Sequence, residues 1–292
     1  MKSITKSGFG IGILVFAAAV IIALPLRTLQ YFTVLESETG FFIKNDWSVY
    51  LLGIVLFAAV IFSVVFGFIK RKTLDYSLET IKRPGQGILS LTACAGILMS
   101  TASVAAELIN ATASFSQEET TNNTILIIQS VFGVLSAIYF LAIGLSFLGT
   151  KSNGSEYKLI SLAPVIWSIF RLVLRFTRTI SYIRVSDLML EMLMLVFFIM
   201  FFMAFAQVSS RVDGEKKEWK IAAYGLPAAL LALVCFVPRF IVMISGNADL
   251  LNEQSPADYC DFGVALFIIS TVVTRVTTKI PNAVSETAIT EE

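Results

Sequence analysis

The segment DLMLEMLMLVFFIMFFMAFAQVS, residues 187–209, decides the class of fold. After Glu191 it contains no charged residue, and its length matches the roughly 20 apolar residues that an α-helix needs to cross a bilayer. The rest of the chain has the same character. Of its 292 residues, 56% are hydrophobic and only 15% are charged, against about 25% charged residues in a typical soluble domain. We therefore expect an integral membrane protein, in which lipid surrounds the apolar side chains.

Seven further segments resemble this one, so the sequence predicts an all-α, polytopic membrane bundle of about eight transmembrane helices. The predicted spans cover residues 8–27, 49–69, 87–107, 125–149, 159–182, 187–209, 221–244 and 259–277. Short polar loops separate them, with neither a soluble domain nor an internal repeat. We interpret residues 1–279 as one helical bundle and residues 280–292 as a short polar cytoplasmic tail.

The positions of lysine and arginine predict the orientation, because cytoplasmic loops of membrane proteins are rich in both. With both termini in the cytoplasm, the inner segments hold 15 of the 22 basic residues: Lys2, Lys6, Lys70, Arg71, Lys72, Lys82, Arg83, Lys151, Lys158, Arg211, Lys216, Lys217, Lys220, Arg275 and Lys279. The predicted outer loops around 108–124 and 245–258 contain none. If residues 159–182 did not cross, this bias would be inverted in the C-terminal half, so we expect that segment to cross as well.

The residue types that are missing restrict the chemistry. The chain has no histidine, which removes the usual general base and the commonest metal ligand. Its three cysteines, Cys94, Cys235 and Cys260, form no C-x-x-C pair. We therefore expect no metal, no cofactor and no enzymatic activity, although serine–lysine or acidic mechanisms stay open. A net charge of +1 gives no indication of a nucleic-acid partner.

One predicted span carries arginines at membrane depth, in PVIWSIFRLVLRFTRTISYIR, residues 164–184. At about 100° per residue, one face of this helix gathers Trp167, Arg171, Arg175, Arg178 and Tyr182. An arginine that faces lipid at the bilayer centre costs at least about 2.5–3.5 kcal/mol on insertion scales. We therefore expect the arginine face to point into the bundle or into water.

Acidic residues at a similar depth offer partners. Asp187 and Glu191 share a helix face, and an antiparallel hairpin folded near residue 184 would bring Glu191 level with Arg178, so we predict an ion pair between those two. The predicted ion-pair network comprises Arg27, Glu107, Arg178, Asp187, Glu191 and Asp261. Arg171 and Arg175 have no acid nearby in the sequence, so they need long-range partners, water or an anionic ligand.

Two interpretations of these charges stay open. In the first, Arg171, Arg175 and Arg239, with Trp167 and Tyr182, line an outward-facing polar cavity of a permease or binding component for a small anionic or zwitterionic solute. In the second, the protein is a non-transporting sensor, accessory subunit or lipid-binding scaffold whose charges are structural or reach the headgroups. The nearly uncharged inner half disfavours a complete transport path.

The third predicted span, TACAGILMSTASVAAE, residues 92–107, is rich in small residues. Small residues allow helices to approach closely, so we expect tight packing there, with a solvated path lined by hydroxyl groups as the alternative.

The segment LESETGFF, residues 35–42, and the W-x-x-x-R-x-x-x-R pattern of Trp167, Arg171 and Arg175 resemble multi-pass membrane proteins of unassigned function from Gram-positive gut bacteria. The resemblance implies a bacterial plasma membrane and no particular activity. The expected partners are the lipid bilayer and, under the first interpretation, a small anionic solute.

Overall fold

The fold is all-α, as predicted. The computed structural model describes residues 10–34, 46–69, 84–113, 120–149, 159–177, 185–210, 219–247, 251 and 257–277, and these contain helices but no strand. The elements are α1 (Gly10–Thr33), α2 (Trp47–Ile69), α3 (Pro84–Ala113), α4 (Thr120–Leu148), the short 3₁₀ helix η3 (Ile160–Leu162), α5 (Ala163–Thr177), α6 (Val185–Ser209), α7 (Trp219–Ile244) and α8 (Tyr259–Thr277).

The observed boundaries lie close to the predicted ones, with three informative differences. The last helix spans 259–277, as predicted, whereas α1, α3 and α4 extend beyond the apolar segments on which their prediction rested. Their extra turns contain polar residues such as the TTNNT sequence at 120–124, which a helix that projects beyond a hydrocarbon layer accommodates. The predicted pattern 35–42 and the predicted tail 280–292 lie outside the described residues.

Seven of these helices are long and apolar enough to cross a membrane, and α8 is also apolar over its described part, Tyr259–Thr274. Large apolar side chains on the bundle surface are exposed, among them Ile21 at 71%, Phe57 at 69% and Ile54 at 65%. A water-soluble protein rarely exposes continuous apolar surface on this scale. The protein is an integral membrane protein of the multi-pass type.

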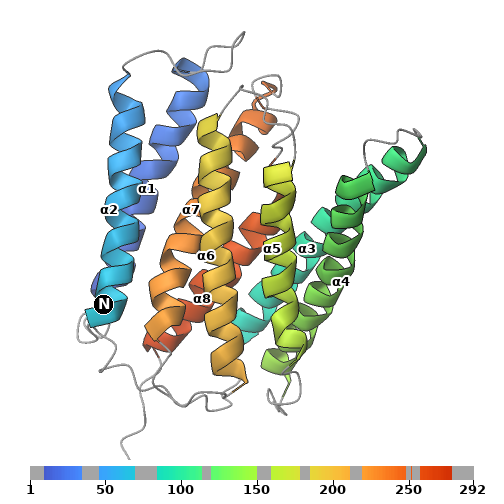
Figure 1. Cartoon of the computed structure of the whole chain (residues 1–292). Coiled ribbons are helices and arrows are strands. Elements are labelled where there is room, and N and C mark those ends of the chain that lie inside the picture. Colours follow the sequence, from blue (N-terminus) through green and yellow to red (C-terminus); the bar gives the residue numbers. More distant parts are fainter. Residues whose placement is uncertain are drawn as a thin grey trace, which may run out of the picture.

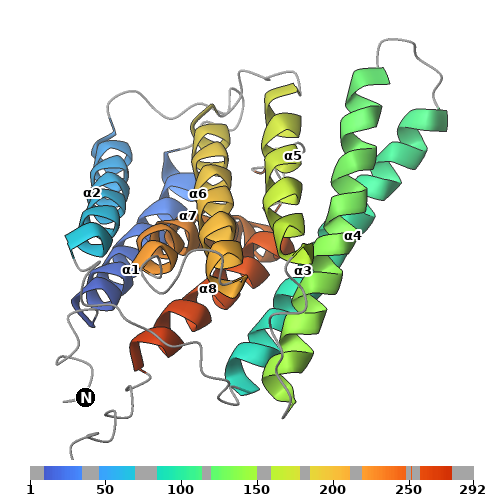
Figure 2. The ribbon, with the colours of Figure 1, turned by 60° about the horizontal axis from the view of Figure 1, so that its bottom comes forward.

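Consecutive helices run in alternating directions (Figure 1). We call the end of the bundle where α1, α3, α5 and α7 finish the upper end, which is the top of Figure 1, and the opposite end the lower end. The most deeply buried helix is α7, which packs against α1, α2, α6 and α8. The α3–α4 hairpin lies at one side of the bundle, where α3 packs on α8 and α4 packs on α5 (Figure 2).

Small residues set the closest helix crossings. A Cβ at Gly67 of α2 would lie 2.5 Å from the Cβ of Ala223 on α7, so only glycine fits there. On α3, a Cβ at Gly96 would lie 2.9 Å from the Cα of Cys260, and on α8 one at Gly263 would lie 2.9 Å from the carbonyl oxygen of Thr92. The small residues of α3 thus allow the backbone of α8 to pack directly against it.

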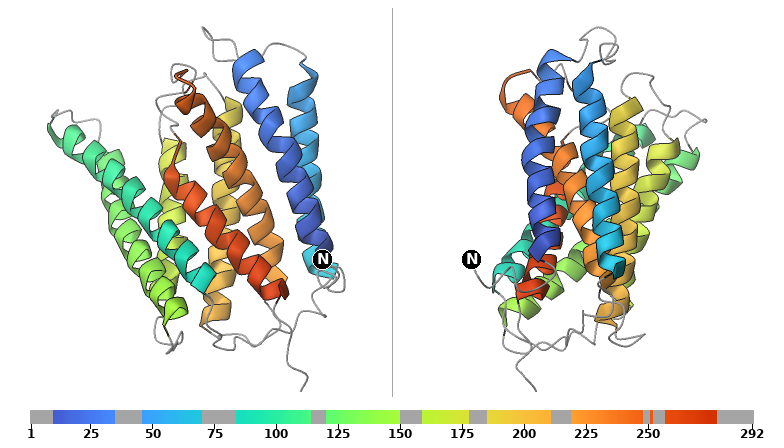
Figure 3. Two further views of the ribbon diagram at one scale, coloured as in Figure 1. Left: turned by 180° about the vertical axis from the view of Figure 1, so that it is seen from behind. Right: turned by 90° about the vertical axis from the view of Figure 1, so that its left-hand side faces the viewer.

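The α8 helix begins near the middle of the bundle (Figure 3, left). Its first residues meet Gly96, at the middle of α3, and the ring of Tyr259 lies 5.6 Å from that of Phe236 on α7. Phe236 precedes the end of α7 at Ile244 by about 12 Å at 1.5 Å per residue. The start of α8 therefore lies about 12 Å below the upper end of α7.

Aromatic side chains fill the lower half. The rings of Phe140 on α4, Phe202 and Phe205 on α6, and Phe267 on α8 contact one another edge to face, with centroids 5.0–5.9 Å apart. All of them are buried, with Phe140 and Phe267 at 0% exposure. These rings form a buried aromatic core in the lower half.

Candidate functional site: buried charges in the upper half

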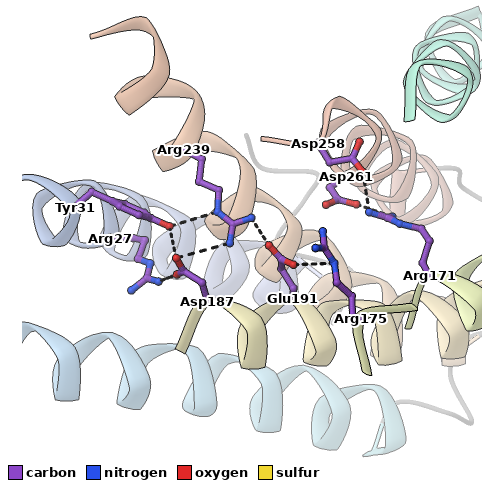
Figure 4. Close-up of polar contacts among 9 residues, drawn as sticks. All are labelled: Arg27, Tyr31, Arg171, Arg175, Asp187, Glu191, Arg239, Asp258 and Asp261. Carbon is purple, nitrogen blue, oxygen red and sulfur yellow. Dashed lines mark hydrogen bonds and ion pairs between the residues drawn. The ribbon is translucent and has the colours of Figure 1, made fainter. Parts of the chain in front are cut away.

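The upper half of the bundle contains eight charged side chains that contact one another across five helices (Figure 4). They form two groups. The first, which we call the α6 group, consists of Arg27, Arg175, Asp187, Glu191 and Arg239. The second, the α8 group, consists of Arg171, Asp258 and Asp261.

In the α6 group, the two carboxylates of α6 lie one turn apart and bind arginines from three neighbouring helices. Asp187 pairs with Arg27 of α1, and one of its oxygens lies 4.0 Å from the guanidinium of Arg239 on α7. Glu191 pairs with Arg239 and, at 3.2 Å, with the Nε of Arg175 on α5. The i, i+4 spacing of Asp187 and Glu191 puts both carboxylates on the same face of α6, which explains why one helix can hold the others.

Neutral side chains complete the α6 group. The hydroxyl of Tyr31 donates to Asp187 at 3.0 Å and accepts from the Nε of Arg239 at 3.4 Å. Arg27 donates to the side-chain oxygen of Gln30 at 2.8 Å, and its guanidinium lies 5.1 Å from the centroid of the Tyr31 ring. These contacts supply hydrogen-bond partners that a buried charge requires away from water.

In the α8 group, Arg171 of α5 binds two aspartates at the start of α8. Its guanidinium donates to Asp261 at 2.8 Å and to Asp258 at 3.0 Å, and it lies 4.9 Å from the centroid of the Trp167 ring. The hydroxyl of Ser100 on α3 also donates to Asp258 at 3.0 Å. The group therefore joins α3, α5 and α8.

The local sequence explains why α8 starts with two carboxylates. Asp258 is the residue before the helix, and its side chain accepts a hydrogen bond from the backbone N–H of Cys260 at 3.0 Å, as an N-cap residue does. Asp261, three residues later, lies on the same side of the first turn. The partial positive charge of a helix N-terminus favours both carboxylates. This partial charge does not neutralise two carboxylates inside a membrane bundle, and the guanidinium of Arg171 adds a full positive charge beside them.

The charges balance in number. Among the described residues of the two groups there are four arginines and four carboxylates. The balance is unequal within each group, with three arginines for two carboxylates in the α6 group and one arginine for two carboxylates in the α8 group. Most of these side chains are less than 10% exposed, whereas Arg175 is 19% exposed and Asp258 is 22% exposed.

The arginine face of α5 points into the bundle, as expected. Arg171 is 7% exposed, whereas Phe176 is 64% exposed on another face of the same helix. Both Arg171 and Arg175 pair with carboxylates of other helices. The sequence had indicated that their charges would need such partners, water or an anionic ligand. Trp167, another residue of the predicted stripe, is fully buried beneath Arg171.

Other predicted residues stand differently. Arg178 and Tyr182 lie outside the described residues, so the predicted ion pair between Arg178 and Glu191 stays a prediction. Glu107, which was included in the predicted network because of its depth, is exposed near the upper end of α3, and its place in an ion-pair network stays a prediction. Arg239, which was predicted to contact a solute, lies between Asp187 and Glu191.

Sequence reasoning missed Asp258, Tyr31 and Gln30. Asp258 fell in a predicted outer loop, although its position directly before a predicted span and three residues before Asp261 is typical of an N-cap. Tyr31 and Gln30 follow Arg27 at i+4 and i+3, but the predicted first span ended at residue 27 and so left them outside the membrane.

No family model matches this chain, and neither a curated protein nor a solved structure matches it. Within the part of the chain that the structure describes, no group of three or more Cys, Asp or Glu side chains is arranged to hold a metal ion. The contacts within the charge network are therefore the evidence on its role.

Proposed function

We propose that this protein is a non-transporting membrane protein, of the accessory-subunit, sensor or scaffold type, and that its embedded charges are structural. It has no catalytic activity under this proposal. The distribution of basic residues and the resemblance to proteins of Gram-positive bacteria support a location in the bacterial plasma membrane, with both termini in the cytoplasm and the upper end of the bundle outside.

The observation that carries the proposal is the mutual compensation of the eight charges. Each of the four arginines has a carboxylate partner on another helix, and each of the four carboxylates has an arginine partner. A buried ion pair contributes little net stability relative to well-packed apolar residues, but it strongly disfavours arrangements that separate its members. The network therefore specifies which helices meet, and at what height.

The lower half supports the same proposal. Phe140, Phe202, Phe205 and Phe267 are packed together beneath the charged layer. A transport path would have to continue from the charges past these buried rings, and close-packed protein interiors contain few voids larger than a water molecule.

A second candidate is a binding component for a small charged solute that enters from the upper end. The observation that favours it is the partial exposure of Asp258 and Arg175, at 22% and 19%, within an otherwise buried network. Non-helical backbone at membrane depth, such as Ala257 and Asp258, occurs where it is buried in protein or where it lines water. These two side chains would be the first that a solute reaches.

A thermal-unfolding screen of the purified protein separates the two candidates. The probes are inorganic phosphate, glutamate and glycine, tested on the wild type, Asp258→Asn and Arg175→Gln. We expect no probe to raise the unfolding temperature of the wild type, or any increase to be the same in all three proteins. A probe that stabilises the wild type but not one of these variants would overturn the structural proposal in favour of solute binding.

A further inference from the structure

The α5 helix is the least suited to the membrane of the seven helices that are long enough to cross it. The apolar stretch that includes it and the preceding η3 has the lowest mean hydropathy of the seven, at 1.5. It also carries Arg171 and Arg175, each of which opposes insertion unless it is paired.

The two arginines obtain their partners at different stages of chain synthesis. Glu191, the partner of Arg175, follows it by 16 residues and arrives as soon as α5 and α6 form a hairpin. Asp258 and Asp261, the partners of Arg171, follow it by 87 and 90 residues, after the whole of α6 and α7. During insertion of α6 and α7, Arg171 therefore lacks the two carboxylates that neutralise it in the finished bundle.

The α8 helix depends on α5 in return. Its first turn lies near mid-height of the bundle (Figure 3) and begins with two carboxylates, those of Asp258 and Asp261. Arg171 is the arginine that pairs with both of them in the described structure. At that depth, neither the guanidinium of Arg171 nor the two carboxylates of α8 are favourable without the other.

We infer that α5 is held across the membrane by the later docking of α8, so that the N-terminus of α8 locks the topology of the C-terminal half. Before α8 docks, the α5 segment exchanges between a transmembrane position and a position at the membrane surface. The Arg171–Asp258–Asp261 contact ends that exchange. This role concerns assembly of the fold and goes beyond the structural function proposed above.

The inference is tested by membrane topology, because failure of α5 to cross inverts the segments that follow it. Single cysteines are introduced into the full-length chain before α5, as Gly154→Cys, and after α6, as Gly214→Cys. The chain is synthesised into sealed membrane vesicles and labelled at once with a membrane-impermeant maleimide. The native cysteines are buried, so the wild-type chain supplies the background.

In the wild type, positions 154 and 214 should lie on the same side of the membrane. The double variant D258N/D261N should raise the proportion of chains with position 214 on the opposite side about tenfold or more, since it leaves Arg171 unpaired. The matched control D187N removes a buried carboxylate from the α6 group and should leave the topology unchanged, because the arginines that it contacts in the described structure, Arg27 and Arg239, lie on the strongly apolar helices α1 and α7.

The triple variant R171M/D258N/D261N should return to the wild-type labelling pattern, since it removes the unpaired charge. Unchanged topology in D258N/D261N, or an equal change in D187N, would overturn the inference. Labelling straight after synthesis makes the result independent of whether a variant later unfolds or is degraded.

Discussion

Arg171→Met and Arg239→Met are chemically identical changes at similarly buried positions, yet the structure predicts different outcomes. The side chains are 7% and 5% exposed. Arg171→Met leaves Asp258 and Asp261 without their arginine. Arg239→Met leaves two balanced pairs, since Glu191 retains Arg175 and Asp187 retains Arg27.

The magnitudes follow from what each substitution leaves behind. Removing one member of a buried ion pair costs about 3–5 kcal/mol, because the remaining charge is uncompensated. We expect the low end, about 3 kcal/mol, for Arg171→Met, since Asp258 is 22% exposed and keeps its hydrogen bond from Ser100. For Arg239→Met we expect a loss of about 1 kcal/mol, because both carboxylates keep an arginine and methionine fills much of the space of the apolar part of the arginine side chain. The difference of about 2 kcal/mol corresponds to roughly 30-fold in the unfolding equilibrium constant.

The assay is equilibrium unfolding of the purified proteins in mixed micelles with increasing mole fraction of sodium dodecyl sulfate. Phe176→Met, a change on the exposed face of α5, serves as control and should stay within about 0.5 kcal/mol of the wild type. If Arg239→Met loses as much stability as Arg171→Met, or more, then the assignment of the charges to two separate groups, of which only the α6 group has an arginine to spare, is wrong.

Further predictions use the same unfolding assay. Glu191→Gln removes the carboxylate that Arg175 and Arg239 share and should cost about 3 kcal/mol of unfolding free energy. Asp258→Asn leaves the one-to-one pair of Arg171 and Asp261 and should cost about 1 kcal/mol. The reverse order of the two losses would contradict the account. Arg171→Lys should recover less than half of the stability lost in the methionine variant, because an ammonium group cannot bind two carboxylates with a planar fork, and full recovery would show that charge alone suffices. Gly67→Val should cost at least about 2 kcal/mol because its Cβ would lie 2.5 Å from an α7 side-chain atom, whereas Gly53→Val has no atom within 4 Å and should be nearly neutral. Equal losses at the two glycines would argue against the close crossing of α2 and α7.

The helices themselves could be predicted from the sequence because apolar length is a local property. The segment 187–209 has to be a helix in lipid whatever surrounds it, and 259–277 was predicted with its observed limits. The inward direction of Arg171 and Arg175 also followed from one helix, since an arginine that faces lipid is costly.

The partners of those arginines could not be predicted, because pairing depends on the order of helices around the bundle. Helical periodicity says which side chains share a face but not which helix lies opposite. Arg171 therefore had no assignable partner, although its acids lie on α8. Depth along the predicted spans also placed Asp258 in an outer loop, because α8 begins below the upper end of its neighbours.

The most direct test of the central claim, that the embedded charges compensate one another inside the bundle, is a thermodynamic cycle on the α8 group. The unfolding free energies of the wild type, R171M, D258N/D261N and R171M/D258N/D261N give the coupling between Arg171 and the two aspartates. The account predicts a coupling of about 2 kcal/mol or more, with the triple variant more stable than R171M. Additive losses within about 0.5 kcal/mol would contradict it, because they would mean that Arg171 and the aspartates are stabilised independently.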